Sequence, residues 1–181
     1  YFTGGNNIGI KHTILENTPD YAALLNPDAI AESDWLSTSI EKLEHDQQIG
    51  MVAPKIYFAK GKQKGLINSA GMIYDGFKQA YDRGTGEKDT GQYDKDEYLQ
   101  ALSGTALVIR TQALLKTGLF WERLKMYLED VELSIRMTKN NWKLLYTPST
   151  VVLHKYMQST KKSTNVYKKN WLNKNFALIA I

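Results

Sequence analysis

The sequence of 181 residues contains no cysteine. This absence excludes disulfide bonds and thiolate metal sites, so any bound metal must be held by carboxylate, histidine or carbonyl ligands. Ligands of that kind suit hard divalent cations, and we therefore expect Mg²⁺ or Mn²⁺ if the protein uses a metal.

The sequence also lacks a long apolar run. No stretch approaches the roughly 20 residues that a membrane-spanning helix needs, and no signal-peptide pattern opens the chain. These absences predict a cytoplasmic protein. A hydrophobic content of 43% is ordinary for a globular protein, and the length suits a single domain over residues 1–181. Because the chain begins at Tyr1, without the apolar strand that usually opens an α/β domain, we expect that domain to be a fragment.

Acidic side chains are absent after Glu132, although the chain has 19 of them. This asymmetry indicates an anionic partner, such as ligand phosphates, nucleic acid or an acidic membrane surface, but a solvated lysine face explains it equally well. Within this part of the chain, residues 155–181 are expected to form a basic loop and an amphipathic helix. The basic residues after Glu132 are Arg136, Lys139, Lys143, Lys155, Lys161, Lys162, Lys168, Lys169 and Lys174.

Patterns typical of strands and helices alternate along the chain. Strands are predicted at 21–25, 51–58, 67–75, 101–110, 142–148 and 150–155, and helices at 33–45, 111–117, 129–140 and 167–181, with a short helix capped by Asn7. Residues 76–96 form a polar loop too long for a simple connection. The alternation predicts an α/β fold, and the buried apolar strands indicate a mostly parallel sheet flanked by helices.

An acidic cluster made of Glu129, Asp130 and Glu132 begins the predicted helix 129–140. Acids in a first helical turn are stabilised by the helix dipole, and they need no catalytic role to explain them. Paired carboxylates are also the usual groups for acid–base chemistry. Composition and spacing leave both interpretations open.

Two further segments place polar residues at strand ends. Asn26, Pro27 and Asp28 follow the predicted strand 21–25, where α/β sheets bind ligands, although Asn and Asp beside Pro are also common turn residues. His154 ends the apolar run 150–153, where a lone histidine is more often a hydrogen-bonded structural residue than a metal ligand. Together with the acidic cluster, these residues could converge on one cation and diphosphate site.

The order of seven segments resembles the family 2 glycosyltransferases with a GT-A fold, particularly their bacterial rhamnosyltransferase-like branch. The resemblance covers nearly the whole chain, except that the part that holds the nucleotide base in this family, before the GGNN segment, is absent. The segments are FTGGNNIGI, LLNPDA, SAGMIYDG, SGTALVIR with the following TGLF, MYLEDVELSIRM, NNWKLLYTPSTVVLHK and KNWLNKN.

The resemblance implies an inverting, metal-dependent sugar transfer from a nucleotide-diphospho-sugar. It implies that Asp130 is the general base that takes the proton of an acceptor hydroxyl, and that the catalytic residue Glu129 orients Asp130 or contacts the acceptor. It also implies that Asp28 and His154 bind the divalent cation. Asn26 stands where many relatives have the first aspartate of an Asp-x-Asp motif, as this branch usually shows, and it is expected on the donor side.

Other site residues and partners follow from the same resemblance. Expected donor contacts are Asn7, Gly104, Ser159, Thr160 and Lys161, and Trp142 is expected either in the core or as a platform for the acceptor. The acceptor would be a glycan or lipid-linked glycan of bacterial cell-surface polysaccharide synthesis, and the basic C-terminal part could rest on the inner face of the cell membrane.

Two other classes of function compete with the enzyme. A truncated or degenerate transferase domain could act as a non-catalytic module that binds glycans or membranes. A binder of nucleic acid or membrane surface could act through the lysines, but the chain has no RNA-binding aromatic motif or helix-turn-helix signature, so we expect no nucleic-acid partner.

Overall fold

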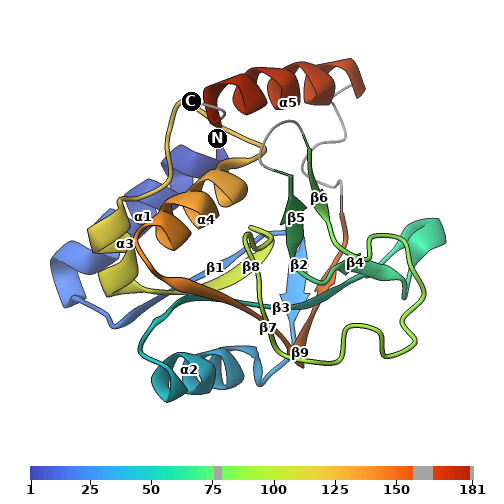
Figure 1. Ribbon diagram of the computed structural model, residues 1–181, viewed down its shortest axis with the longest axis horizontal. Coiled ribbons are helices and arrows are strands. Elements are labelled where there is room, and N and C mark those ends of the chain that lie inside the picture. The colour runs from blue at the N-terminus through green and yellow to red at the C-terminus, as the bar shows by residue number, and fades with distance from the viewer. Residues whose placement is uncertain (76–78, 157–164, 180–181) are drawn as a thin grey trace.

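The computed structural model describes residues 1–75, 79–156 and 165–179. A seven-stranded sheet crosses the molecule, and helices cover both of its faces (Figure 1). Its strands are β1 (Tyr21–Leu25), β2 (Ala29–Ala31), β3 (Ile49–Phe58), β4 (Ile67–Ser69), β7 (Glu97–Tyr98), β8 (Ala106–Arg110) and β9 (Lys143–His154). A separate hairpin joins β5 (Met72–Tyr74) to β6 (Ala80–Asp82). The helices are α1 (Phe2–Asn17), α2 (Trp35–His45), α3 (Thr111–Thr117), α4 (Glu129–Lys139) and α5 (Asn165–Ile179), with a 3₁₀ turn, η1 (Gly61–Gln63).

The sheet is mixed, so the prediction of a mostly parallel sheet is wrong. Its main strands have the order β1-β8-β3-β9-β2, and β4 and β7 pair with β3 and β9 respectively. Only β3 and β9 run parallel, whereas the other pairs in this sheet are antiparallel. Continuous apolar runs show that a strand is buried on both faces, which here results from helices on both sides, but they carry no information about strand direction.

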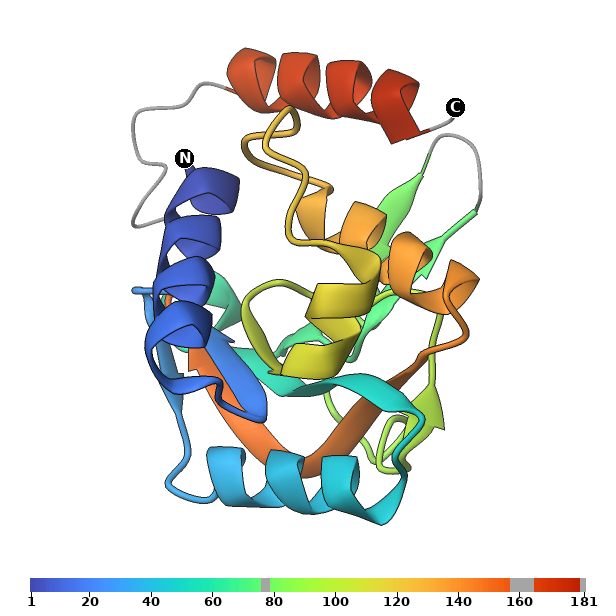
Figure 2. The same cartoon turned by 90° about the vertical axis from the view of Figure 1, so that its left-hand side faces the viewer.

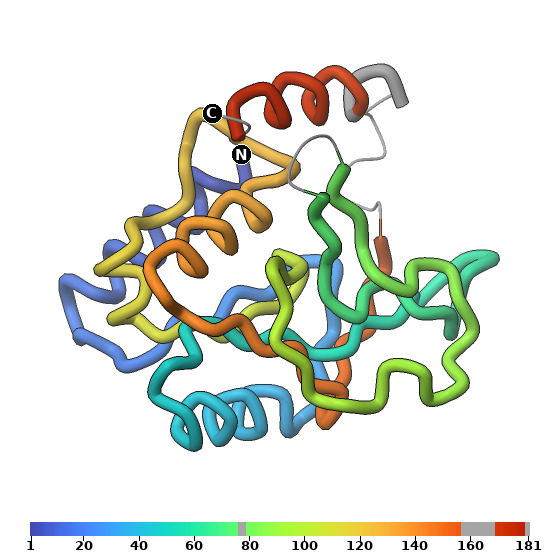
Figure 3. The backbone as a smooth tube through the Cα atoms, in the orientation of Figure 1, coloured from blue at the N-terminus to red at the C-terminus, as the bar shows by residue number. Residues whose placement is uncertain are grey.

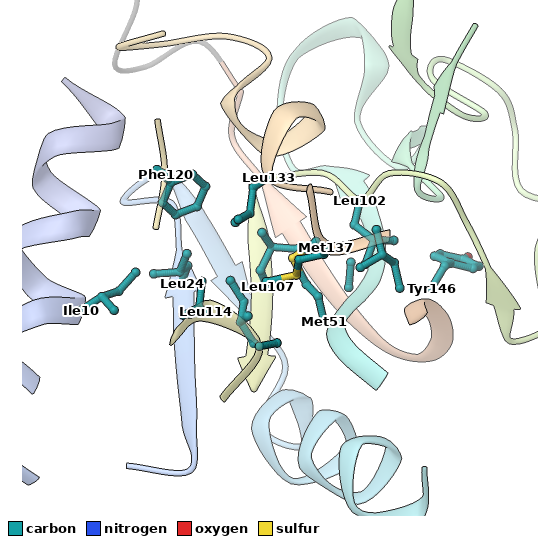
Figure 4. Packing of buried hydrophobic residues seen from close by; sticks show 14 of the residues in the cluster. Ile10, Leu24, Met51, Leu102, Leu107, Leu114, Phe120, Leu133, Met137 and Tyr146 are labelled. Atoms are coloured by element: carbon teal, nitrogen blue, oxygen red, sulfur yellow. The ribbon is translucent and has the colours of Figure 1, made fainter. Parts of the chain in front are cut away.

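Helices on the two faces bury two separate sets of apolar side chains (Figure 2). Successive residues of a strand point to opposite faces, so Met51 and Leu107 pack on the side of α3 and α4, and Val52 packs on the side of α2. The larger cluster also takes Leu133 and Met137 from α4, as Figure 4 shows. This packing fixes α4 against the sheet and thereby determines where the acidic cluster lies.

Several predicted elements differ in detail from the structure. The N-terminal helix begins at Phe2, so Asn7 lies inside it and does not cap it. The segment 67–75 forms β4 and β5, separated by Gly71 with a φ of 93°. The strands predicted on either side of Pro148 are one strand, β9, whose register against β3 shifts between Thr147 and Val151.

The long polar segment after β5 is more structured than the sequence suggests. It contains β6 and then runs outward past β4 before it returns to the sheet as β7 (Figure 3). Backbone hydrogen bonds join Ile67 to both Gly86 and Glu87 along this path. Buried Lys55 contacts Asp89 and Asp94 in the same segment.

The C-terminal helix α5 lies across the end of the molecule above the start of α4 (Figure 1). Its Leu172, Phe176 and Ile179 pack against a third cluster that includes Leu128 and Val131. Within the described part of the chain, no helix has the length and apolar character needed to cross a membrane.

Candidate active site

Asp28 and His154 come together at one end of the sheet. Asp28 follows β1, His154 ends β9, and His154 faces Ala29 in the β2–β9 pairing. The His154 Nε2 atom lies 3.2 Å from Asp28 Oδ1, and the two residues are 6% and 7% exposed. The prediction that these residues, distant in sequence, converge is therefore confirmed by the geometry of the strand ends.

Asn68 is the third member of this group, and sequence reasoning missed it. Its Oδ1 lies 2.8 Å from the Nδ1 of His154, and the residue is 4% exposed. Asn68 lies inside the buried strand β4, and a buried amide needs a hydrogen-bond partner. A polar amide within a predicted strand could therefore have indicated this residue.

The hydrogen bond to Asn68 determines what the other nitrogen of the imidazole can do. With Nδ1–H donating to Asn68, a neutral imidazole presents the lone pair of Nε2 to the Asp28 carboxylate. Burial lowers the pKa of His154, although the Asp28 charge opposes this shift, so the neutral form is favoured. Two electron-pair donors that face each other at this distance fit a shared divalent cation.

The described residues contain no cluster of three or more His, Asp or Glu side chains that could hold a metal ion. A cation at Asp28 and His154 would therefore have these two ligands among the described His, Asp and Glu side chains, and substrate phosphates or water can contribute to the rest of its coordination. This arrangement is typical of Mg²⁺ sites, in which substrate phosphates complete the coordination.

Asp130 lies at the start of α4, and its carboxylate accepts hydrogen bonds from two backbone N–H groups. The Gly104 N–H donates to Asp130 Oδ2 at 2.8 Å, and the Val131 N–H donates to Asp130 Oδ1 at 2.8 Å. Burial raises the pKa of Asp130, while these N–H donors oppose the shift because they stabilise the charged form. The two N–H donors thus fix the carboxylate in place, which suits a general base.

Glu129 differs from Asp130 although they are neighbours. It is 7% exposed, and its Oε2 atom is buried without a hydrogen-bond partner among the described residues. Burial, and then the charge of Asp130, raises the pKa of Glu129 to about 8. The neutral form of Glu129 is therefore favoured at neutral pH. Glu132, the third acid of the cluster, binds Arg136 on the same helix.

A chain of contacts links Asp130 to the Asp28 side of the site. Gly104 precedes Thr105, whose carbonyl oxygen accepts the Asn26 N–H at 2.9 Å. The carboxyl ends of β1 and β9 and the amino end of β8 lie at the same edge of the sheet, because β8 is antiparallel to both β1 and β3 and β9 is parallel to β3. The acidic cluster and the Asp28–His154 pair therefore border one site.

Gly104 lies directly against Asp130. A Cβ atom added there would lie 3.2 Å from both Cβ and Oδ2 of Asp130. The glycine thus allows the carboxylate of Asp130 to reach the backbone of this segment, and its contact with the donor stays a prediction.

Asn7 and Trp142 lie away from this group. The amide of Asn7 donates to the Phe120 carbonyl and to Glu122 and accepts the Phe120 N–H, so it joins α1 to the segment after α3. Trp142 follows the far end of α4, and at about 1.5 Å per residue this helix extends roughly 14 Å from Asp130 to its last residue, Lys139. Trp142 packs on Gly50 and lines a separate surface cavity. Ser159, Thr160 and Lys161 lie outside the described residues.

The chain resembles known glycosyltransferases in sequence. It is 46% identical over 59 residues to an N-acetylglucosaminyl-diphospho-decaprenol L-rhamnosyltransferase of Mycobacterium tuberculosis, a match that covers 33% of this chain and 19% of that protein. It is 25% identical over 171 residues to the probable glucomannan 4-beta-mannosyltransferase 11 of Oryza sativa subsp. japonica, which covers 94% of this chain and 28% of that protein. No family model matches the chain.

The fold resembles that of a solved glycosyltransferase. The crystal structure of GalNAc-T7 with UDP, GalNAc and Mn²⁺ superposes with a TM-score of 0.71 and 17% identity, and the match covers 98% of this chain and 34% of that one. The chain therefore has the GT-A fold of that glycosyltransferase. The sequence relatives support its place among the family 2 glycosyltransferases. The chain spans about a third or less of the length of each of these three proteins.

Proposed function

We propose that this domain transfers a sugar, with inversion, from a nucleotide-diphospho-sugar to a hydroxyl group of a glycan or lipid-linked glycan. The observation that carries the proposal is the Asp130 carboxylate, fixed on the Gly104 N–H at the edge of the sheet where Asp28 meets His154. The names of the sequence relatives support sugar transfer, and the Mn²⁺ in the GalNAc-T7 crystal supports a divalent cation.

Asp130 would remove the proton of the acceptor hydroxyl with a lone pair of its carboxylate. Each of its carboxylate oxygens accepts one backbone N–H, which leaves further lone pairs for the hydroxyl of an acceptor. As the acceptor oxygen forms its bond to the anomeric carbon, its proton passes to Asp130 and the bond to the diphosphate breaks. Because the departing group leaves on the opposite face of the sugar, the configuration inverts.

The diphosphate would leave at the side of the site that contains Asp28. Asp28, His154 and the Asn68 that orients the imidazole would hold a divalent cation. Such a cation, when bound, neutralises the negative charge that develops on the leaving diphosphate. The chain itself contributes the fixed ligand pair and the low exposure that strengthens these electrostatic interactions.

The biological setting that we propose is bacterial cell-surface polysaccharide synthesis. The supporting observation is the mycobacterial relative, whose name includes a lipid-linked diphosphate sugar. Peripheral contact with the inner face of the membrane would use exposed lysines of α5 such as Lys169 and Lys174, because the apolar residues Leu172, Phe176 and Ile179 already pack on the protein.

Calorimetric titration of UDP-, dTDP- and GDP-sugars, with and without Mn²⁺, tests the proposal. We expect one nucleotide series to bind only with Mn²⁺, and the Asp28→Asn variant to lose that dependence because its amide is a weaker cation ligand. Asp34→Asn is the matched control, since the Asp34 carboxylate accepts the Thr150 hydroxyl and the residue is the N-cap of α2. Absence of binding in every series would favour a non-catalytic module that binds glycans.

A further inference from the structure

The helix α5 contacts the loop that leads into α4 (Figure 2). The contact is made by Asn175, a fully buried residue in the last part of α5. Its Nδ2 atom lies 3.0 Å from the carbonyl oxygen of Leu124, 2.9 Å from that of Met126 and 2.7 Å from that of Tyr127. Because an amide NH₂ has two hydrogens, at least one of them is shared between two carbonyl groups.

The backbone of this loop needs such support. Lys125, Tyr127 and Leu128 have φ angles of 60°, 67° and 68°, in the left-handed region that side chains other than glycine disfavour. Thr3 of α1 donates to the remaining carbonyl of the series, that of Lys125, through its backbone N–H at 3.3 Å. Four consecutive carbonyl groups, those of residues 124–127, thus accept hydrogen bonds from the two terminal helices.

The loop determines where α4 begins. Leu128 is the N-cap residue of α4, and Glu129 and Asp130 follow it directly. The Leu128 side chain is 4% exposed and shares an apolar cluster with Leu172 and Phe176 of α5. The Asp130 carboxylate reaches the Gly104 N–H only if the first turn of α4 keeps this position, because that bond spans two separate segments.

We propose that Asn175 is a positioning residue for Asp130. Its amide holds the carbonyl groups of the left-handed loop, so that α4 begins where the Asp130 carboxylate meets the Gly104 N–H. The hydrogen bonds of Asn175 to the described residues are made to Leu124, Met126 and Tyr127, so it acts on Asp130 through residues 124–128. The catalytic consequence rests on the proposed function, in which Asp130 is the general base.

Three variants of α5 test this role. Asn175→Ala removes every donor to the loop, Asn175→Ser keeps one hydroxyl donor, and Asn173→Ala is the matched control because Asn173 is exposed on the same helix. Circular dichroism reports whether each chain is folded. The NMR resonance of the Gly104 amide reports on its hydrogen bond to Asp130, and this measurement does not depend on catalysis.

We expect the Gly104 resonance and its pH titration to change in Asn175→Ala, to change less in Asn175→Ser and to stay constant in Asn173→Ala. In transfer assays with the donor identified by titration, kcat should fall about 10- to 100-fold in Asn175→Ala, with the KM for the donor almost unchanged. A fall in kcat without a change in KM indicates that the base is misplaced, whereas a rise in KM would indicate a loss of donor binding.

A folded Asn175→Ala variant with the wild-type Gly104 resonance and the wild-type kcat would overturn the proposal. Failure of both Asn175 variants to fold would also overturn it, because the residue would then serve stability alone. The wild type and all variants could fail to transfer sugar while the Gly104 resonance still changes in Asn175→Ala. In that case Asn175 does position Asp130, and the proposed function of Asp130 as a base is wrong.

Discussion

Glu129 and Asp130 show how two adjacent carboxyl groups acquire different properties from their surroundings. Asp130 accepts two backbone N–H groups, whereas the buried Oε2 atom of Glu129 has no partner among the described residues. Hydrogen bonds to a carboxylate favour its charged form, and burial without them favours the neutral form. The surroundings therefore fix the Asp130 carboxyl group in place and favour the neutral form of Glu129 at neutral pH.

The raised pKa of Glu129 predicts a pH-dependent cost in stability. The folded chain keeps the Glu129 proton up to about pH 8, whereas the unfolded chain releases it near pH 4.3. Stability from this group is therefore complete below about pH 4 and decreases as the pH rises to 8, by at most about 1.4 kcal/mol per pH unit. Glu129→Gln cannot ionise, so we expect it to be more stable than the wild type at pH 8 and to lose this advantage at pH 4.

Urea unfolding of the wild type and Glu129→Gln at pH 4, 6 and 8 measures this difference. The matched control is Glu41→Gln, on the exposed side of α2. If the difference in the free energy of unfolding were the same at all three pH values, Glu129 would not be a neutral buried acid.

Some residues of the candidate site could be predicted from the sequence, and others could not. Asp28 and His154 could be predicted because strand ends of an α/β sheet gather polar groups, and the structure places them in contact. Asn68 and Asn175 could not, since a buried amide gives no sign of which distant carbonyl or imidazole it meets. Asn175 contacts residues 48 to 51 positions away in the sequence.

At the scale of the elements, long patterned segments were predictable and short ones were not. The helices α2, α3 and α4 lie where the apolar spacing and the caps predict them. The strands β4 to β7 have only two or three residues each, which is too short to show a period. β4 and β7 pair with the long strands β3 and β9, whereas β5 and β6 pair with each other in a separate hairpin.

The segment between β6 and β7 is held by the side chains of β3. Lys55 Nζ lies 2.8 Å from Asp89 Oδ2, and the Tyr57 hydroxyl donates to the same carboxylate. The hydrogen bond from Lys55, followed by that from Tyr57, lowers the pKa of Asp89 to about 2. These contacts explain how a polar segment of this length becomes ordered without a core of its own.

The lowered pKa of Asp89 predicts how the stability depends on acid. The stabilisation is fully present above the ordinary pKa near 4 and is lost as the pH falls towards 2, and it amounts to about 2 kcal/mol. We therefore expect Asp89→Asn to destabilise the chain at pH 6 by about that amount and to equal the wild type near pH 2. Unfolding curves at these pH values measure the difference.

Asp94→Asn is the comparison for this prediction. Asp94 also contacts Lys55, but its side chain is 60% exposed, so solvent screens the interaction and the variant should cost less. An Asp89→Asn variant that stays equally destabilised at pH 2 and pH 6 would contradict the assignment of the effect to the ionised pair.

At the scale of the whole molecule, the mixed sheet assembles the site from distant parts of the chain. β1, β8 and β9 present their ends at one edge, and Asp130 at the start of α4 accepts the Gly104 N–H near the amino end of β8. The family resemblance predicted this fold, and the match to a solved glycosyltransferase confirms it. Strand directions could not be predicted from apolar runs, because both orientations bury the same side chains.

The account as a whole depends on Asp130 as the base, so the most direct measurement is the transfer rate of Asp130→Asn with the donor that titration identifies. Asparagine keeps the shape of the side chain but cannot take a proton at neutral pH. We expect a folded variant with wild-type donor binding and a loss of transfer of about 10²- to 10⁴-fold. A folded Asp130→Asn variant that transfers sugar at the wild-type rate would contradict the role of Asp130.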